Sequence, residues 1–495
     1  MNYIVVRLWD KELGRLAWDS VKRTTYFMFN PDLKQRPDVT PLLRSANEKD
    51  KGLPVYGDSR RIYQNLPPFL ADSLPDSWGN KLFDQWIRHS RISRSKVTPL
   101  DKLIFIGRRG MGALEFHPAV EELEHSRDVN LKSLYDLSIE IMNRRESVTL
   151  NSLDDITFQS LLSVGTSAGG RQMKAIVAIK PATGEIRSGQ IADLKGFDYF
   201  IIKFEDEVVP TSEIEMVFYE MAVAGGIDME ECRLLRVEGV THFMTRRFDR
   251  KEGRKIHMQT LAAINPEAES YEDLMDTCRR LQLTDGELQE LFRRLVFNVL
   301  ANNTDDHNKN FSFLLEQDGQ WKLSPAYDMT FIFAADAHHP QPTRCMSLYG
   351  KISEITKDDL LDFAKDNSIR NAEEIIKKIA DALMLYPALA KKYSIPAGWS
   401  NIIHKTLRDN LIRFGYIIPS EKSSEFMDKY GRDIKFESLT INSKGYYRLN
   451  VTIDGKPRRR FIKPDTDLFD SLHQYEMQTL PDHLFISLIE RIFPD

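Results

Sequence analysis

The chain has 495 residues and a formal net charge of −5, because 68 lysines and arginines stand against 73 aspartates and glutamates. This length predicts two to four domains at about 100–200 residues each, and the slightly acidic balance argues against autonomous, tight, sequence-independent binding to DNA. Hydrophobic residues make up 42% and charged residues 28%, which is the balance of a globular protein and excludes intrinsic disorder.

Cysteine usage and hydropathy narrow the class of protein further. Cys232, Cys278 and Cys345 lie far apart and form no CxxC pair, which excludes a disulfide scaffold and a cysteine-rich zinc module. No apolar run approaches the ~18 residues of a membrane span. The first ten residues alternate like a strand and meet charge too early for a signal peptide. We therefore expect a cytoplasmic protein without membrane contact.

The first part of the chain predicts a mixed α+β region. Short strands are expected near 3–9 and 13–18, and a helix near 77–90 follows the turn Leu74–Asn80. The glycine-rich segment 106–114 predicts a tight connection. A polar stretch with a helix near 132–144 is expected to link this region to the next.

Strands and then helices dominate the remainder. The expected strands are 174–179, 199–204 and 242–248. Two helices are expected, and each follows a capping box. The helix 212–224 opens with the box from Ser212 to Glu215, and the helix 285–301 with the box from Thr284 to Glu287. A small β-rich unit followed by a helix is expected to close the chain. The predicted domains are 1–125 (accessory), 155–265 (nucleotide-binding lobe), 266–415 (α-helical lobe) and 416–495 (extension).

The most informative segment follows the 285–301 helix directly. Asp305 and Asn310 have the Asp-x4-Asn spacing of a kinase catalytic loop, in which the aspartate accepts the hydroxyl proton and the asparagine holds Mg²⁺. Asp328, at the end of a later strand, would be the second magnesium ligand. A plain Asn- and Asp-rich turn is an equally simple explanation of the loop. A hydrolytic metal site built from Asp305, Asp306 and His307 is a weaker alternative.

Lys203 lies within the apolar strand Phe200–Phe204, where an inward-pointing charge needs a partner. In kinases a strand lysine reaches the phosphates and is oriented by a helix glutamate, for which Glu215 is the nearest candidate. Each residue also has a purely structural interpretation. Lys203 could point to the solvent face of its strand, and Glu215 could only complete the capping box. The segment Gly165–Lys174 adds a glycine-rich turn before a strand, which suits phosphate oxygens but fits no Walker A or GxGxxG pattern.

In this order the fragments resemble the HipA-type serine/threonine kinases, the toxin half of a class of bacterial toxin–antitoxin modules. The resemblance covers roughly residues 1 to 400. Besides the segments already named, it depends on Gly110–Leu114, Arg247–Arg250, His257–Thr260, Thr304–Phe311 and Pro325–Asp328. It implies a two-lobed, protein-kinase-like α+β fold with an amino-terminal accessory domain and a small carboxyl-terminal β-rich extension.

The resemblance also implies roles for individual residues. Asp305 would be catalytic, and Asn310 and Asp328 would bind Mg²⁺. The implied ATP-binding residues are Lys203, Ser167, Gly169, Gly170, Lys174, Arg247, Phe248, Asp249 and His307. Of these, Arg247, Phe248 and Asp249 belong to the hinge beside the adenine, which would contribute mainly backbone hydrogen bonds. Autophosphorylation of the glycine-rich turn is implied at Ser167, the matching position; Thr166 lies beside it, and Ser163, further from the glycines, is another candidate. The chain departs from the family pattern at Arg246, where the hinge commonly carries an acidic residue, and at Arg171 and Met173 in the turn.

The implied function is an ATP- and Mg²⁺-dependent serine/threonine kinase that phosphorylates a protein of the translation machinery, of the aminoacyl-tRNA synthetase class. The implied partner is a small helix-turn-helix antitoxin, through which DNA would be contacted only indirectly. The alternative is a nucleotide-binding pseudokinase that acts as a co-repressor with that antitoxin. The extension, which has no counterpart in the family pattern, contains a hairpin. Its basic return strand, 458–463, is more typical of a solvated sheet edge than of a nucleic-acid site.

Overall fold

A computed structural model describes most of the chain. The described residues are 3–32, 38–42, 52–124, 128–143, 161–162, 172–190, 194–205, 209–334, 343–416, 425–427, 432–441, 447–462 and 492–493. The chain divides into two compact units, one of Met1–Pro396 with Asp409–Phe414 and one of Ala397–Arg408 with Gly415–Asp495. Among the described residues, no helix is both long and apolar enough to cross a bilayer.

The N-terminal region, residues 3–124, is built on an antiparallel sheet of order β4-β3-β2-β1-β5. Alternation in β1 buries Ile4, Val6 and Leu8 and leaves the intervening side chains more exposed, as a half-buried strand requires. The strands are β1 (Tyr3–Leu8), β2 (Lys11–Asp19), β3 (Thr24–Phe29), β4 (Val55–Tyr56) and β5 (Leu114–His117), and the helices are α2 (Pro68–Ala71), α3 (Ser77–His89) and α4 (Pro99–Ile106).

A second antiparallel sheet, of order β7-β6-β8-β10-β9, follows in the chain. Strand β6 is apolar after Lys174, and five of its six residues are buried, whereas in β8 the apolar residues lie between Asp198 and Lys203 at its two ends. The elements of this part are α5 (Leu131–Asn143), β6 (Lys174–Ile179), β7 (Ile186–Ser188), β8 (Asp198–Lys203), α7 (Thr211–Ala224), β9 (Cys232–Val237) and β10 (Val240–Arg246).

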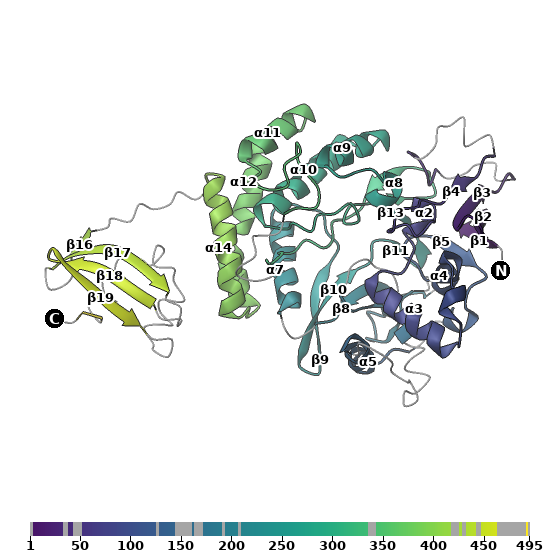
Figure 1. Cartoon of the computed structure of the whole chain (residues 1–495), viewed down its shortest axis with the longest axis horizontal. Helices are drawn as coiled ribbons and strands as arrows, with labels where there is room; N and C mark the ends of the chain where they lie inside the picture. Colours follow the sequence, from purple (N-terminus) through teal and green to yellow (C-terminus); the bar gives the residue numbers. More distant parts are fainter. Residues whose placement is uncertain are drawn as a thin grey trace. The chain divides into compact units, whose positions relative to one another are not determined.

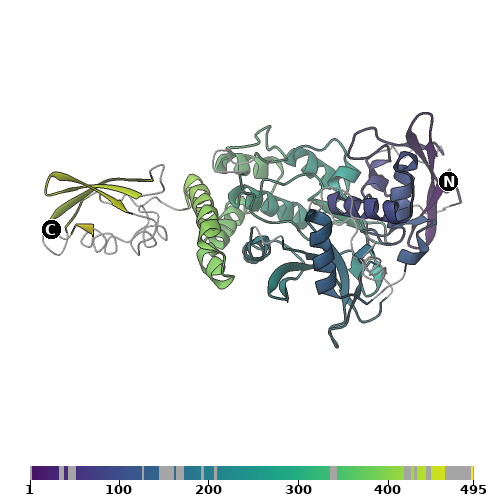
Figure 2. The same ribbon diagram turned by 60° about the horizontal axis from the view of Figure 1, so that its bottom comes forward.

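The rest of the first unit is mainly helical around the small sheet β13-β14-β15. Its elements are β11 (Arg250–Lys251), β12 (Arg254–Lys255), β13 (His257–Thr260), α8 (Leu261–Ile264), α9 (Tyr271–Arg280), α10 (Asp285–Leu300), β14 (Ser312–Leu315), β15 (Trp321–Leu323), α11 (Lys357–Asp366), α12 (Ala372–Leu383) and α13 (Tyr386–Lys392). The predicted capping box of Thr284 and Glu287 starts α10. In Figures 1 and 2, α10 and α12 lie together, and the N-terminal sheet lies at the end of this unit remote from them.

Helix α14 (Ala397–Arg413) contributes residues to both units. The second unit also contains the four-stranded antiparallel sheet β16 (Glu425–Met427), β17 (Asp433–Ile441), β18 (Tyr447–Ile453) and β19 (Lys456–Ile462), which is drawn in yellow in Figure 1. The predicted hairpin turn joins β18 to β19. Asp454 and Gly455 both have positive φ, of 48° and 73°, as the two central residues of a type I′ turn require.

The predicted mixed α and β architecture is confirmed, and the predicted elements of the first unit lie within a few residues of the observed ones. The predicted capping box at Ser212 is wrong. Helix α7 begins one residue earlier, and its N-terminal groups bond instead to Glu205, which accepts hydrogen bonds from the Thr211 hydroxyl at 2.9 Å and from the Ser212 N–H at 2.8 Å. Glu215 is thereby left for another contact.

Candidate active site

A cavity of about 540 Å³ lies between the N-terminal region and the rest of the first unit. It is lined by six of the residues predicted for catalysis, metal binding or ATP binding, namely Lys174, Lys203, Asp305, His307, Asn310 and Asp328. A second, smaller cavity of about 60 Å³ shares Lys174, Lys203 and Asp328 with it and is bordered by Arg247 and Phe248. The structure therefore brings residues from widely separated parts of the sequence to one site.

Lys203, at the end of β8, is the cation at the centre of this site. Its ammonium group forms ion pairs with Glu215 of α7 and with Asp328. The Lys203 side chain is 15% exposed, and burial alone would lower its pKa, but Asp328 and Glu215 raise the pKa above its usual value. Lys203 is therefore charged at every physiological pH, although it sits in a largely apolar strand.

The two carboxylates that face Lys203 differ in their proton affinity. Burial raises the pKa of Glu215, an effect that Lys203 opposes and Asp328 reinforces. Burial also acts on Asp328, but the attraction of Lys203 outweighs it and lowers the pKa of Asp328. Glu215 thus holds the lysine in place from the helix side, and Asp328 remains the ionised partner on the cavity side.

Asp328 has a backbone conformation that few residues adopt. Its φ is 53°, in the left-handed region that aspartate and asparagine tolerate better than other side chains except glycine. The preceding residue, Tyr327, is anchored by hydrogen bonds between its hydroxyl group and the Lys309 carbonyl at 2.8 Å and Ser312. This arrangement connects the segment that carries Asp328 to the loop that carries Asp305.

The loop between α10 and β14 presents Asp305 and Asn310 to the larger cavity. The Asn310 amide group donates a hydrogen bond to the backbone carbonyl of Asp305 at 2.7 Å, and the Asn310 N–H donates to the His307 carbonyl at 2.8 Å. The Asp305 side chain is exposed, and the Cys345 thiol approaches it at 3.7 Å. The loop is a closed turn that leaves the Asp305 carboxylate exposed, with the Cys345 thiol as its neighbour.

Asp306, next in sequence, points the other way. Its carboxylate is fully buried and accepts hydrogen bonds from the Tyr271 hydroxyl at 2.6 Å, from the Arg344 guanidinium at 2.7 Å and from the Cys345 N–H at 2.9 Å. It is absent from the described residues that line either cavity. This geometry disfavours the alternative of a metal site made of Asp305, Asp306 and His307. Among the described residues, no three His, Cys, Asp or Glu side chains are grouped so that they could hold a metal ion.

Lys174, the first residue of β6, is a second buried cation. Its ammonium group lies 3.0 Å from a carboxylate oxygen of Asp76, and its backbone carbonyl accepts a hydrogen bond from the Trp78 indole at 3.0 Å. Asp76 is also the N-cap of α3, where it accepts a hydrogen bond from the Gly79 N–H. The N-terminal region therefore holds the start of β6 through both its side chain and its backbone.

Ser167, Gly169 and Gly170, which were predicted to contact ATP, lie outside the described residues, so the structure gives them no position. The described residues on either side of this turn are both bound by the N-terminal region. Arg109 donates a hydrogen bond to the Leu162 carbonyl at 2.7 Å, and Asp76 and Trp78 bind Lys174.

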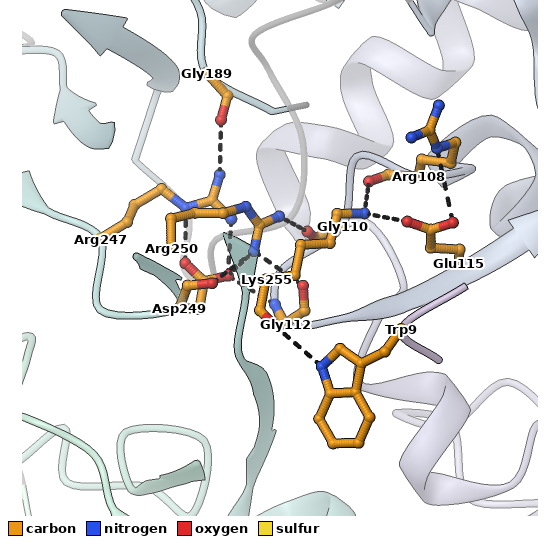
Figure 3. Close-up of polar contacts among 10 residues, drawn as sticks. All are labelled: Trp9, Arg108, Gly110, Gly112, Glu115, Gly189, Arg247, Asp249, Arg250 and Lys255. Carbon is orange, nitrogen blue, oxygen red and sulfur yellow. Dashed lines mark hydrogen bonds and ion pairs between the residues drawn. The ribbon is translucent and has the colours of Figure 1, made fainter. Parts of the chain in front are cut away.

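The predicted hinge divides into two parts. Phe248 lines the smaller cavity, and its ring lies 5.8 Å from that of Tyr327. Asp249 is not among the described residues that line a cavity, because its carboxylate is buried between Arg247 and Arg250 at 2.8 Å from each guanidinium (Figure 3). Its side chain is therefore committed to these arginines, and only its backbone is left for the predicted contact with ATP.

Two residues of the site lie in segments that contributed to the family resemblance but were given no role from the sequence. Asp76 and Met111 of the N-terminal region both border the larger cavity, and Met111 also borders the smaller one. Asp76 is the N-cap of α3, and nothing local in the sequence indicated that it also pairs with Lys174. A lone methionine between two glycines carries no chemical pattern of its own.

Comparison with known proteins identifies the family to which this arrangement belongs. The HipA N-terminal domain model matches residues 4–117, and the HipA-like C-terminal domain model matches residues 166–385. Two curated relatives are a protein named "Putative kinase Y4mE" from Sinorhizobium fredii, 23% identical over 175 residues, and one named "Putative kinase" from Haemophilus influenzae, 29% identical over 156 residues. These matches cover 32% and 27% of the chain and only 41% and 45% of the relatives, less than half of their length.

The fold is also similar to a solved structure, that of HipA from Shewanella oneidensis in a complex of this toxin–antitoxin system with HipB and operator DNA. The TM-score is 0.56 with 16% sequence identity, and the match covers 83% of this chain and 97% of the other. The two domain models together account for about two thirds of the sequence, in the family's order and on the family's fold. The chain belongs to the HipA family.

Proposed function

We propose that this protein is an ATP- and Mg²⁺-dependent serine/threonine protein kinase and the toxin of a toxin–antitoxin module. The observation that carries the proposal is the position of Lys203, which is paired with Glu215 and Asp328 on the wall of the same cavity that Asp305 and Asn310 line. Kinases use a strand lysine, a helix glutamate, a catalytic aspartate and two magnesium ligands in these roles.

The residues present fit the two groups that the reaction needs. Lys203 and Lys174 supply buried positive charge for phosphate oxygens, and the smaller cavity supplies apolar walls for a base. Asn310 and Asp328 offer an amide and a carboxylate oxygen, which are ligands that Mg²⁺ prefers without a closed protein cage. When bound, this ion would neutralise charge on the transferred phosphoryl group.

Asp305 would accept the proton of the substrate hydroxyl group. Its carboxylate is exposed to the cavity and is not consumed by an ion pair in the described structure, unlike that of Asp306. Asn310 fixes the backbone of Asp305 through its amide hydrogen bond, so the base is held while its carboxylate oxygens stay accessible. Ser167 of the glycine-rich turn is proposed as the site of autophosphorylation.

The proposed substrate is a protein of the translation machinery of the aminoacyl-tRNA synthetase class, and the proposed partner is a small DNA-binding helix-turn-helix antitoxin. The net charge of −5 supports an indirect contact with DNA, because this chain lacks the charge excess of an autonomous DNA-binding protein. The complex from Shewanella oneidensis contains HipA together with HipB and operator DNA, which supports the same type of assembly here.

The decisive experiment is incubation of the purified chain with MgATP, followed by intact-mass measurement and peptide mapping. We expect the wild type to gain phosphate on the peptide that contains Ser167, and Asp305→Ala to gain none. Asp276→Asn, an exposed aspartate on α9, is the matched control and should behave as wild type. Equal phosphate on wild type and Asp305→Ala would refute the mechanism, whereas ATP binding without any transfer would favour the pseudokinase.

The substrate is best found by comparing phosphopeptides from cells that express the wild type and cells that express Asp305→Ala. Sites that appear only with the wild type, and on a protein of the translation machinery, would support the proposed substrate class. Sites confined to proteins outside translation would refute that class while leaving the kinase activity intact.

A further inference from the structure

The C-terminal sheet carries a local excess of positive charge that the net charge of the whole chain conceals. Between residues 447 and 463, which include β18 and β19, six lysines and arginines stand against a single acidic residue, Asp454. The whole chain, in contrast, has a net charge of −5. The two family domain models end at residue 385 and do not include this sheet. The proposed kinase function therefore leaves this charge unexplained.

Strand β19 lies at one edge of the sheet, and β18 is its neighbour in the described order (Figure 1). Every residue of β19 from Lys456 to Phe461 is exposed. Four of these residues are cations, namely Lys456, Arg458, Arg459 and Arg460. In the described part of the chain, none of the four forms an ion pair. These charges are therefore not neutralised by described carboxylates of the same chain.

The register between β18 and β19 determines which side chains share a face of the sheet. Strand β18 buries every second residue from Leu449 to Ile453, so this face is covered. On the other face, Arg448 lies opposite Phe461, and Asn450 lies opposite Arg459. Opposite residues of an antiparallel pair point to the same side. One face of the β18–β19 pair therefore combines two arginines with an aromatic ring.

Phe461 is the ring on this face, and it is 52% exposed. One exposed aromatic ring is ordinary on a protein surface, but this one lies directly across from Arg448. The Arg459 Nε atom donates a hydrogen bond to the Asn450 side-chain oxygen at 3.0 Å, which orients the guanidinium on the same face. A solvated sheet edge, which the sequence alone favours, accounts for the charges but not for the ring between them.

An added β-strand is a poor occupant of this edge. Pro457 has no N–H group, so β19 cannot offer a continuous row of donors to a further strand. Charged side chains along an edge strand also oppose such pairing. We therefore expect a partner to bind the side chains of β19 and not its backbone.

We propose that the face formed by Arg448, Arg459 and Phe461 binds an unpaired segment of RNA. Bases of single strands stack on exposed aromatic rings, while positive charge follows the phosphate backbone. Phe461 stacks on one base, and the two arginines bind the phosphates beside it. RNA is the source to which the inference commits, because its loops, bulges and ends expose unstacked bases. This binding goes beyond the proposed kinase function and does not involve the cavities.

The test measures fluorescence anisotropy of a labelled oligo(U) of about 12 nucleotides with the full chain. Phe461→Leu keeps an apolar side chain but loses the ring, so binding should weaken about tenfold. Phe461→Tyr keeps the ring and should stay within about twofold of the wild type. Tyr56→Leu, at an exposed tyrosine of β4, is the matched control and should leave affinity unchanged. Unchanged binding by Phe461→Leu would overturn the inference, and melting by circular dichroism checks that each variant is folded.

Salt dependence tests the phosphate contacts. Each phosphate contact with a single strand contributes about 0.7 to the slope of log affinity against log salt concentration. Arg459→Gln combined with Arg460→Gln should therefore reduce the slope by about 1.4. Arg88→Gln combined with Lys96→Gln removes the same charge from exposed positions of the N-terminal region and should leave the slope unchanged. Equal reductions in both double variants would show that only net charge matters, which would overturn the inference.

Other occupants and the kinase function are distinguished with the same assay. Duplex RNA of equal length should bind about tenfold more weakly than oligo(U), because its base faces are hidden. Equal binding of the duplex, displacement of oligo(U) by hexaglutamate at comparable concentration, or tighter binding of oligo(dT) would each overturn the choice of unpaired RNA. Asp305→Ala should bind oligo(U) as the wild type does, so a failure of the proposed kinase function leaves this result intact.

Discussion

Lys174 and Lys203 are direct cross-strand neighbours in the antiparallel pair β6 and β8. Like charges opposite each other on a sheet are destabilising, and here each lysine has carboxylates of its own. Asp76 faces Lys174, whereas Glu215 and Asp328 face Lys203. Three carboxylates from three separate segments thus keep two ammonium groups together on one cavity wall. These two positive charges would attract the oxygens of a bound triphosphate.

Replacing Lys203 should reveal how much these carboxylates depend on it. Lys203→Met leaves Glu215 and Asp328 facing each other without a cation, so we expect the free energy of unfolding to fall by about 3–5 kcal/mol. Urea denaturation followed by circular dichroism measures this. Adding Glu215→Gln should restore part of the loss, and Lys195→Met, at an exposed lysine, should have no effect. A double variant no more stable than Lys203→Met would contradict the expectation.

The buried ion pair of Asp306 and Arg344, whose carboxylate lines neither cavity, should also be destabilised when one partner is removed. Asp306→Ala removes the partner of a guanidinium whose side chain is 5% exposed, and we expect a loss of about 3–5 kcal/mol in unfolding free energy. The double variant Asp306→Ala with Arg344→Met removes the unpaired charge and should lose clearly less. Strict additivity of the two single changes would count against this pairing.

Stability should depend on pH through His242. Burial lowers the pKa of His242 to about 4, from an ordinary value of 6.5, and its Nδ1 atom accepts a hydrogen bond from the Glu205 N–H at 3.2 Å. Below pH 6.5 the unfolded chain takes up a proton that the folded chain refuses, so stability falls as the pH drops from 6.5 towards 4. Between pH 7 and pH 5 the wild type should lose about 2 kcal/mol more than His242→Phe. Identical pH slopes would show that His242 does not titrate in this way.

Cys345 should be accessible yet slow to react. Burial, followed by the negative charges of Asp305 and Asp306, raises the pKa of its thiol to about 11. Since the thiolate is the nucleophile, alkylation by iodoacetamide at pH 7.5 should be more than about tenfold slower than that of a free cysteine peptide. Asp305→Asn removes the nearest charge and should accelerate it, as peptide mass spectrometry can follow. Rates unaffected by Asp305→Asn would contradict the contact between the two side chains.

Local sequence patterns predicted most of the helices and strands of the first unit, because capping residues, turn glycines and alternating apolar positions act over a few residues. The same locality caused the error at Ser212. The Ser-x-x-Glu spacing fitted a capping box. In the structure, Glu205, in the segment before the helix, binds the N-terminus of α7, and Glu215 forms an ion pair with Lys203. A pairing across 12 residues of sequence competes with the local one, and only the packing of α7 against the second sheet, mainly on β10 and β9, decides between them.

The loop that we propose as catalytic could be singled out from the spacing of Asp305 and Asn310, because both residues lie in one short segment of the sequence. The contribution of the N-terminal region could not. Asp76 and Met111 reach the cavity because the indole group of Trp78 and the backbone of Gly110 and Gly112 form hydrogen bonds that bring two distant parts of the chain together. Such contacts leave no periodic trace in a single sequence, so they emerge only from the three-dimensional structure.

Trp78 also provides a built-in optical reporter. Its indole group is completely buried, and its N–H is bonded to the carbonyl oxygen of Lys174, the residue that begins β6. Indole emission responds to the polarity around the ring and to the loss of this hydrogen bond. With the other tryptophans replaced by phenylalanine, the emission wavelength and lifetime of Trp78 would record, in real time, whether the start of β6 moves when nucleotide is added.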